Sequence, residues 1–220
     1  GWPHAADLMT TQTENLAMER LEKRLEAGET LIVDGAMGTL LHSLGLKPGE
    51  CPELWCLTHP DEVQSIHHRY REAGSNVVEC NSFGGSRFKL RHYGLENRVT
   101  EINRAAAALA RAVAGDTQHV LGSIGPTGEF MEPYGDETEA AFFEAFAEQA
   151  KALEEGGADA VIVETMTSIE ECCVAVRAVR SCTQMTVIAS FTFDPLIHGG
   201  YASMMGVHPE AFALAASAAG

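Results

Sequence analysis

The stretch "LIVDGAMGTLL", residues 31–41, joins a short apolar run to an acid and a glycine-rich turn. The Leu-Ile-Val run at 31–33 predicts a β-strand that is buried on both faces. The two glycines after it predict a tight turn, in which the backbone comes close to another group. Asp34 stands between strand and turn, beside backbone N–H groups. The stretch therefore predicts a buried strand that ends in part of a ligand site.

The composition limits the kind of partner that this chain binds. Of its 220 residues, 45% are hydrophobic and 21% charged, which is typical of a globular protein. With 31 acidic and 15 basic residues, the formal net charge is -16, and such a surface repels nucleic acid and anionic membranes. We expect a small molecule or a protein instead. No apolar stretch reaches the ~20 residues of a membrane span and no signal-peptide pattern is present, so we predict a cytoplasmic protein.

The cysteines and the first residues bear on the organisation of the chain. Six cysteines without a Cys-x-x-Cys pair fit a reducing compartment. The chain begins with Gly1 and has a methionine at Met9, so we interpret residues 1–12 as a tag or a disordered leader. Residues 13–220 are expected to belong to one domain.

Amphipathic helical segments alternate with short apolar runs along the chain. Capping pairs, helix-stop glycines and apolar residues at helical spacing predict the helices, and the apolar runs predict the strands. The expected helices run from Thr11 to about Ala27, from Pro60 to Ala73, from about Glu96 to Ala114 and from Asp136 to about Leu153, with two more opened by Ser168 and Pro209. The expected strands lie at 31–33, 76–81, 119–124, 159–164 and 185–194.

Apolar strands that alternate with amphipathic helices predict an α/β fold with a parallel sheet. Every expected strand ends in a polar or glycine-rich tip. This favours a (β/α)8 TIM-type barrel over an open doubly wound sheet, because a barrel builds its site from all of its βα loops. Residues 13–220 would then be the N-terminal part of the barrel, with about the first five of its eight strands. A sixth strand is due after Gly220, so we expect these residues to be part of a longer polypeptide, and the isolated piece either to self-associate through the open sheet edge or to be poorly stable.

Two acids end different strands of this predicted sheet. Asp34 and Glu164 could point into one mouth and hold a cationic group such as the α-ammonium of an amino acid. The backbone N–H groups of Gly35 and Ala36 are suited to a carboxylate. Each acid could instead cap a helix or pair with a surface lysine, and Gly-x-x-Gly alone is a weak signal.

Asn81 ends the second expected strand, and the period of a strand puts Glu79 on the same face. If that face points inward, Glu79 lies deeper in the barrel, where burial raises the pKa of its carboxyl. A structural hydrogen-bonding role is favoured for it over catalysis. Cys80 should then face away from the mouth.

The remaining cysteines and the histidines give little support for a metal site. The adjacent Cys172 and Cys173 fall on the apolar stripe of a helix outside the sheet, so a core role is favoured. Cys51 and Cys56 precede the second helix and offer two ligands where zinc needs more. The nine histidines form no spaced ligand pattern.

The loops "DGAMGT", "CNSFGGSRFKLRHYGLE", "GSIGPTGE", "VIVETM" and "ASFTFD" occur in an order that closely resembles the homocysteine S-methyltransferase family, in particular the homocysteine-binding domain of cobalamin-dependent methionine synthase. The resemblance runs from about Ala27 to Gly220. It implies a zinc-dependent barrel that methylates the thiol of homocysteine to give methionine. Zinc stabilises the nucleophilic thiolate, and the methyl donor is expected to be methylcobalamin.

The resemblance also implies roles for individual residues. Asp34 and Glu164 would bind the amino group of homocysteine, Gly35 and Ala36 would bind its carboxylate, and Asn81 would lie close to the metal. A corrinoid-binding module or protein is implied as a partner.

One departure from the family concerns the metal. The family holds zinc with three cysteines, in Asn-Cys and Gly-Gly-Cys-Cys contexts that this chain lacks. We therefore expect zinc in the complete domain, with its ligands outside this chain, and no zinc and no activity in the chain alone. The alternatives are a related corrinoid-linked methyltransferase with another methyl donor or acceptor, and a non-catalytic barrel fragment.

Overall fold

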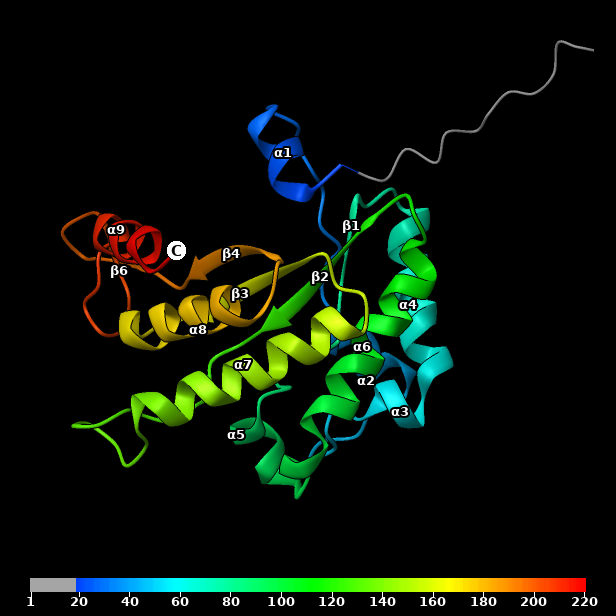
Figure 1. Ribbon diagram of the computed structural model, residues 1–220, viewed down its shortest axis with the longest axis horizontal. Helices are drawn as coiled ribbons and strands as arrows, with labels where there is room; N and C mark the ends of the chain where they lie inside the picture. The colour runs from blue at the N-terminus through cyan, green and yellow to red at the C-terminus, as the bar shows by residue number, and fades with distance from the viewer. Residues whose placement is uncertain (1–18) are drawn as a thin grey trace, which may run out of the picture.

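The computed structural model describes residues 19–220, which form a parallel α/β fold (Figure 1). The expected leader at 1–12 and the expected helix start at Thr11 lie outside the described residues. Four strands form one parallel sheet in the order β1-β2-β3-β4. They are β1 Val77–Glu79, β2 His119–Ile124, β3 Ala160–Met166 and β4 Thr186–Phe191. The strand order follows the chain without a reversal, as expected for consecutive βα units.

The predicted helices from Pro60 onward are present, and shorter helices lie in the loops between them. The helix expected from Thr11 to about Ala27 is wrong in its extent, because Arg20 is extended and the described helix begins at Leu21. The longer helices are α4 Pro60–Glu72, α6 Val99–Ala114, α7 Glu139–Glu155, α8 Ile169–Cys182 and α9 Pro209–Ala219. The shorter ones are α1 Leu21–Glu26, α2 Gly38–Leu44, α3 Trp55–Thr58, α5 Arg87–Leu90, η1 Arg91–Tyr93 and η2 Glu96–Arg98. Among these described helices, none is long and apolar enough to cross a membrane.

The long helices cover one face of the sheet in the order of the chain. Helix α6 packs between α4 and α7, and α8 packs between α7 and α9. Figure 1 shows α6, α7 and α8 running along the same side of β2 and β3. The main core lies between these two layers and contains Val78, Phe142 and Phe146. The opposite face carries a smaller cluster of Val77, Leu121 and Ala160, which α1 covers with Leu21.

The helix starts follow the sequence signals, with one correction. Pro60 and Pro209 occupy the first turns of α4 and α9, where a missing N–H costs nothing. Ser168 caps α8 by accepting a hydrogen bond from the backbone N–H of Glu171. The predicted start at Asp136 is wrong: Thr138 caps α7 instead. The residue before it, Glu137, is held in the loop, because its backbone O accepts a hydrogen bond from the N–H of Glu132.

The first predicted strand is the largest discrepancy. Residues 31–33 form a single parallel bridge, between Val33 and Val77, rather than a strand. The expectation of burial on both faces is wrong, since Ile32 is 60% and Val33 41% exposed. The reason is that only β1 pairs with this segment among the described residues, so one edge is uncovered.

The later strands also differ from their predicted ends. β3 continues past Glu164 to Met166, with a break in register between Val163 and Met166. The fifth predicted strand ends at Phe191 rather than at 194, and β5 Asp194–Pro195 pairs with β6 Tyr201–Ala202 in a separate antiparallel ribbon. Phe191 stacks on Phe212 of α9 with 4.7 Å between ring centroids, which fixes the last helix on the sheet.

Candidate functional site

A cavity of about 430 Å³ lies at the carboxyl ends of the first strands. This volume is in the range of small-molecule sites. Every predicted site residue lines it: Asp34, Gly35, Ala36, Asn81 and Glu164. The turn after Val33, the loop after β1 and the end of β3 therefore meet at one place, although they are distant in sequence.

Asp34 is held by one carboxylate oxygen and leaves the other without a hydrogen bond. Its Oδ1 accepts a hydrogen bond of 2.9 Å from the backbone N–H of Glu79. Its side chain is only 1% exposed, and Oδ2 has no hydrogen-bond partner among the described residues. The nearest cationic candidate is Nδ1 of the buried His67, at 3.9 Å. A buried carboxylate oxygen in this state is costly unless a ligand cation or donor reaches it.

Glu164 enters the cavity from β3, where the backbone is irregular. Its Oε1 accepts a hydrogen bond from the hydroxyl of Ser123 on β2, and its Oε2 accepts a longer one, of 3.4 Å, from Thr165. Thr165 has a φ of 57°, which is unfavourable for a β-branched residue. This residue lies inside the register break of β3, so local strain accompanies the position of Glu164.

Glu79 is a third carboxyl in the lining. Burial is the main cause that raises its pKa to about 8; the charge of Glu164, a close contact with Glu164 and the charge of Asp34 act in the same direction. The increase expected from the strand period is thus confirmed. Cys80 packs in the core between sheet and helices, but it also contributes to the cavity lining, so the prediction that it faces away from the mouth holds only in part.

The turn after Asp34 presents free backbone donors. Among the hydrogen bonds of the described residues, none uses the N–H of Gly35 or Ala36. Tyr70 of α4 fixes the turn from behind, because its hydroxyl donates to the carbonyl of Ala36 over 3.0 Å. A Cβ at Gly35 would come within 3.1 Å of the same hydroxyl. Two adjacent free amides can bind an anion such as a carboxylate.

Asn81 is fixed by protein contacts, and its neighbour in the lining was not predicted. The Nδ2 of Asn81 donates to the carbonyl of Pro52 over 2.8 Å. Glu53, from the same loop as Pro52, accepts a hydrogen bond of 2.7 Å from the N–H of Gly84 and so positions the loop after β1. Sequence analysis missed Glu53 because it lies in an irregular loop without periodicity. The contact of His67 with Asp34 was not predicted either.

The described residues do not supply a zinc site. Between residues 19 and 220, no group of three or more His, Cys, Asp or Glu side chains is arranged to hold a metal ion. Burial raises the pKa of Cys51 and Cys172 to about 12, so both are neutral thiols near pH 7. Cys172 lies in the core as predicted, whereas Cys173 is only partly buried. Cys56, predicted in a loop, is a buried residue of α3.

Fold and site together define a parallel α/β protein with an acidic small-molecule cavity at the carboxyl end of its sheet. Residues 31–220 match the homocysteine S-methyltransferase family, and the chain belongs to this family.

Individual relatives agree with this assignment. The chain is 34% identical to the methionine synthase of Mycobacterium tuberculosis over 162 residues and 33% identical to that of Mycobacterium leprae over 175 residues. These alignments cover 68% and 74% of this chain but 14% of each relative. The fold is similar to the crystal structure of the homocysteine methyltransferase MmuM from Escherichia coli in its metallated form. The TM-score is 0.74 at 21% identity, over 89% of this chain and 73% of that one.

Proposed function

We propose that the chain binds homocysteine in the cavity between Asp34 and Glu164, as part of an enzyme that methylates the homocysteine thiol to methionine. The observation that carries this proposal is that one cavity offers groups suited to a cation and groups suited to an anion. Two carboxyl groups suit an α-ammonium, and the free amides of Gly35 and Ala36 suit an α-carboxylate. An α-amino acid carries these two charges on adjacent atoms, which matches the short distance along the chain from Asp34 to the turn.

The larger assembly belongs to the same proposal. The chain spans about 14% of the methionine synthases that it matches, so the activity of a whole protein is inferred and not observed. We propose that the sheet is the first part of a (β/α)8 barrel, which its sequential strand order and one-sided helices support. Methylcobalamin, delivered by a corrinoid-binding module, is the proposed methyl donor.

Zinc takes no part in the chemistry that we derive from these residues, because their donor set does not fit it. We propose that a complete domain supplies its zinc ligands outside this chain. The role of the described residues is to bind and orient the substrate. Fixing its ammonium and carboxylate leaves the thiol as the one part of homocysteine that is free to reach a methyl donor.

Calorimetric titration of the chain with L-homocysteine tests the proposed function. The matched control ligand is 4-mercaptobutanoic acid, which keeps the thiol and the carboxylate and lacks the amino group. We expect L-homocysteine to bind at least about tenfold more tightly, the scale of one charged hydrogen bond. Equal affinities of the two ligands, or no binding of L-homocysteine, would contradict the proposal.

A further inference from the structure

The cavity lining holds more negative groups than one ammonium needs. Besides Asp34 and Glu164 it contains the carboxyl of Glu79 and that of Glu53, which accepts a hydrogen bond from the N–H of Gly84, and the described lining includes no lysine, arginine or histidine. The nearest imidazole, on His67, lies behind Asp34 and is fully buried. Oδ2 of the almost fully buried Asp34 has no hydrogen-bond partner among the described residues, and neither do the ring nitrogens of His67 beside it, so no protein hydrogen bond offsets the charge of Asp34 on this side.

We propose that Glu79 is a third carboxyl of the ammonium subsite, and that it releases its proton to solvent when a cationic amino group enters beside Asp34 and Glu164. The inference rests on the proposed function, since it concerns the same site. It adds Glu79 to the subsite. It also predicts that the affinity for the ligand depends on pH, which Asp34 and Glu164 alone do not require.

The surroundings of Glu79 explain why it would hold a proton in the empty site. Asp34 faces it from the turn after residue 33 and Glu164 faces it from β3; the hydroxyl of Ser123 on β2 acts in the opposite direction and lowers the pKa of Glu79, but it donates its hydrogen bond to Glu164. A buried carboxyl between two acids is most stable in its neutral form, and its pKa of about 8 agrees with this.

A bound ammonium reverses this balance. Its positive charge offsets the repulsion from Asp34 and Glu164, which lowers the pKa of Glu79 and favours release of the proton. Binding that releases a proton becomes tighter as pH rises. The affinity should therefore increase from pH 6.5 to 8.0, a range in which the amino group of an amino acid ligand stays protonated.

L-Methionine is the suitable probe, because it has the ammonium and the carboxylate but no thiol that could release a proton of its own. Calorimetric titrations at pH 7 in buffers of different ionisation enthalpy give the number of protons released. We expect up to about one proton per bound L-methionine, and roughly three- to tenfold tighter binding at pH 8.0 than at pH 6.5. The deaminated analogue 4-(methylthio)butanoic acid should release none.

Glu79→Gln is the informative variant. The glutamine keeps the size of the side chain and the backbone hydrogen bond to Asp34, and it removes the titrating group. We expect the variant to bind L-methionine without proton release and with a flat pH profile. Glu171→Gln is the matched control: Glu171 is another buried carboxyl whose pKa burial raises, but it contacts Thr127 and does not line the cavity. Its pH profile should equal that of the unmodified chain.

Two outcomes separate this inference from the proposed function. If neither L-homocysteine nor L-methionine binds, the proposed function fails together with the inference. If L-methionine binds without proton release, the inference alone is wrong. If Glu79→Gln does not fold, the buffer dependence of the unmodified chain still decides, and ¹³C NMR titration of its glutamate carboxyls adds a direct test. A Glu79 pKa near 4.5 in the ligand-free chain would overturn the inference.

Discussion

The backbone N–H of Glu79 and Oδ1 of Asp34 are joined by a hydrogen bond of 2.9 Å. This bond connects the second predicted strand to the turn after the first, at the level where the cavity begins. It uses Oδ1 of Asp34, while Oδ2 is buried, has no hydrogen-bond partner among the described residues and lies 3.9 Å from Nδ1 of His67. The same pair therefore links the sheet to the proposed subsite.

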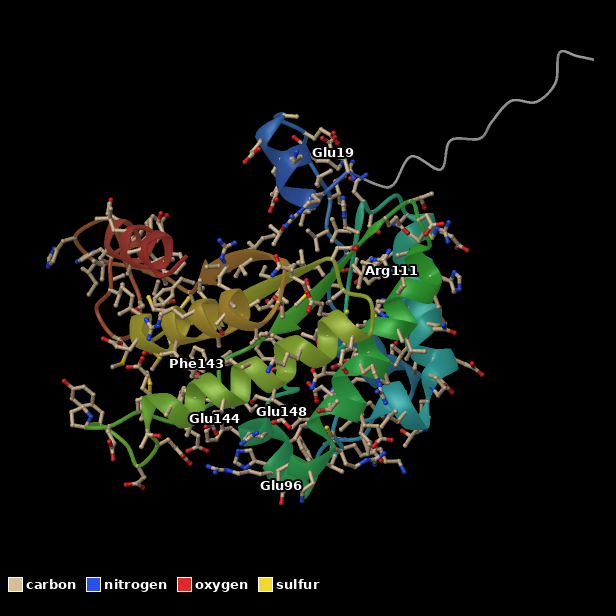
Figure 2. All side chains as sticks on the ribbon, viewed as in Figure 1. Glu19, Glu96, Arg111, Phe143, Glu144 and Glu148 are labelled. Atoms are coloured by element: carbon tan, nitrogen blue, oxygen red, sulfur yellow. The ribbon has the colours of Figure 1, made fainter. Side chains whose placement is uncertain are left out.

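Removing the charge of either flanking acid should weaken substrate binding. We expect Asp34→Asn and Glu164→Gln each to reduce the affinity for L-homocysteine by about 1.5 to 3 kcal/mol, because each loses a charged hydrogen bond to the ammonium. Isothermal titration calorimetry measures the effect. The control is Glu144→Gln on the exposed side of α7 (Figure 2), which should leave the affinity unchanged. Unchanged affinity in both site variants would rule out the assigned roles.

The unfolding free energy should depend on pH through Glu79. In the folded chain its pKa is about 8, against an ordinary value of 4.5. Between these values the folded state holds a proton that the unfolded state has lost, so the unfolding free energy falls as pH rises, by up to about 1.4 kcal/mol per pH unit. Urea melts at pH 5.5, 6.5 and 7.5 should show a smaller decrease for Glu79→Gln. Equal slopes in both proteins would place the pKa of Glu79 near its ordinary value.

The core between helices and sheet should be sensitive to truncation at Phe142. This side chain is fully buried and packs against Phe88, with 5.2 Å between ring centroids. Phe142→Ala should reduce the unfolding free energy by about 3 to 5 kcal/mol. Phe130→Ala, at a phenylalanine that is largely exposed, should cost less than about 0.5 kcal/mol. Chemical denaturation of both variants tests the difference, and similar losses would contradict the described packing.

Gly85 should tolerate no side chain. A Cβ there would lie 2.2 Å from Oδ1 of Asn103 and 2.8 Å from Nε2 of Gln149, both buried. Gly85→Ala should therefore cost about 1 to 3 kcal/mol of stability. Gly38 begins α2 and has open space around its Cβ position, so Gly38→Ala should be neutral or slightly stabilising. Thermal melts should give a lower melting temperature for Gly85→Ala than for Gly38→Ala. A Gly85→Ala protein as stable as the unmodified chain would show that the loop after β1 can move aside.

Metal removal should leave this chain unchanged. The described residues offer no metal-binding group, and the three-cysteine motifs of the family are absent from the sequence. We expect elemental analysis to find no stoichiometric zinc, and EDTA to leave the melting temperature unaltered. One tightly held zinc per chain would show that the cysteines present bind metal in an arrangement other than the described one.

The sequence predicted the site best where an apolar strand pattern is followed directly by an acidic residue. Asp34 and Glu164 could be placed at one mouth because both follow apolar runs, and parallel strands bring their carboxyl ends together. Burial of the 31–33 segment could not be predicted correctly, because it depends on what covers its second edge. Glu53 lies in an irregular loop that no period of the sequence marks. His67 falls on the buried face of α4 at helical spacing from Val63, but that period does not show which carboxylate the imidazole meets.

The backbone at Thr165 has a consequence for attempts to engineer this protein. Its φ of 57° suits glycine or asparagine far better than threonine, so a screen for heat resistance alone should select a replacement at this position. The same replacement would relax the irregular end of β3 and remove the hydroxyl that donates to Glu164. Heat resistance and ligand affinity should therefore change in opposite directions here, and libraries at position 165 need both selections at once.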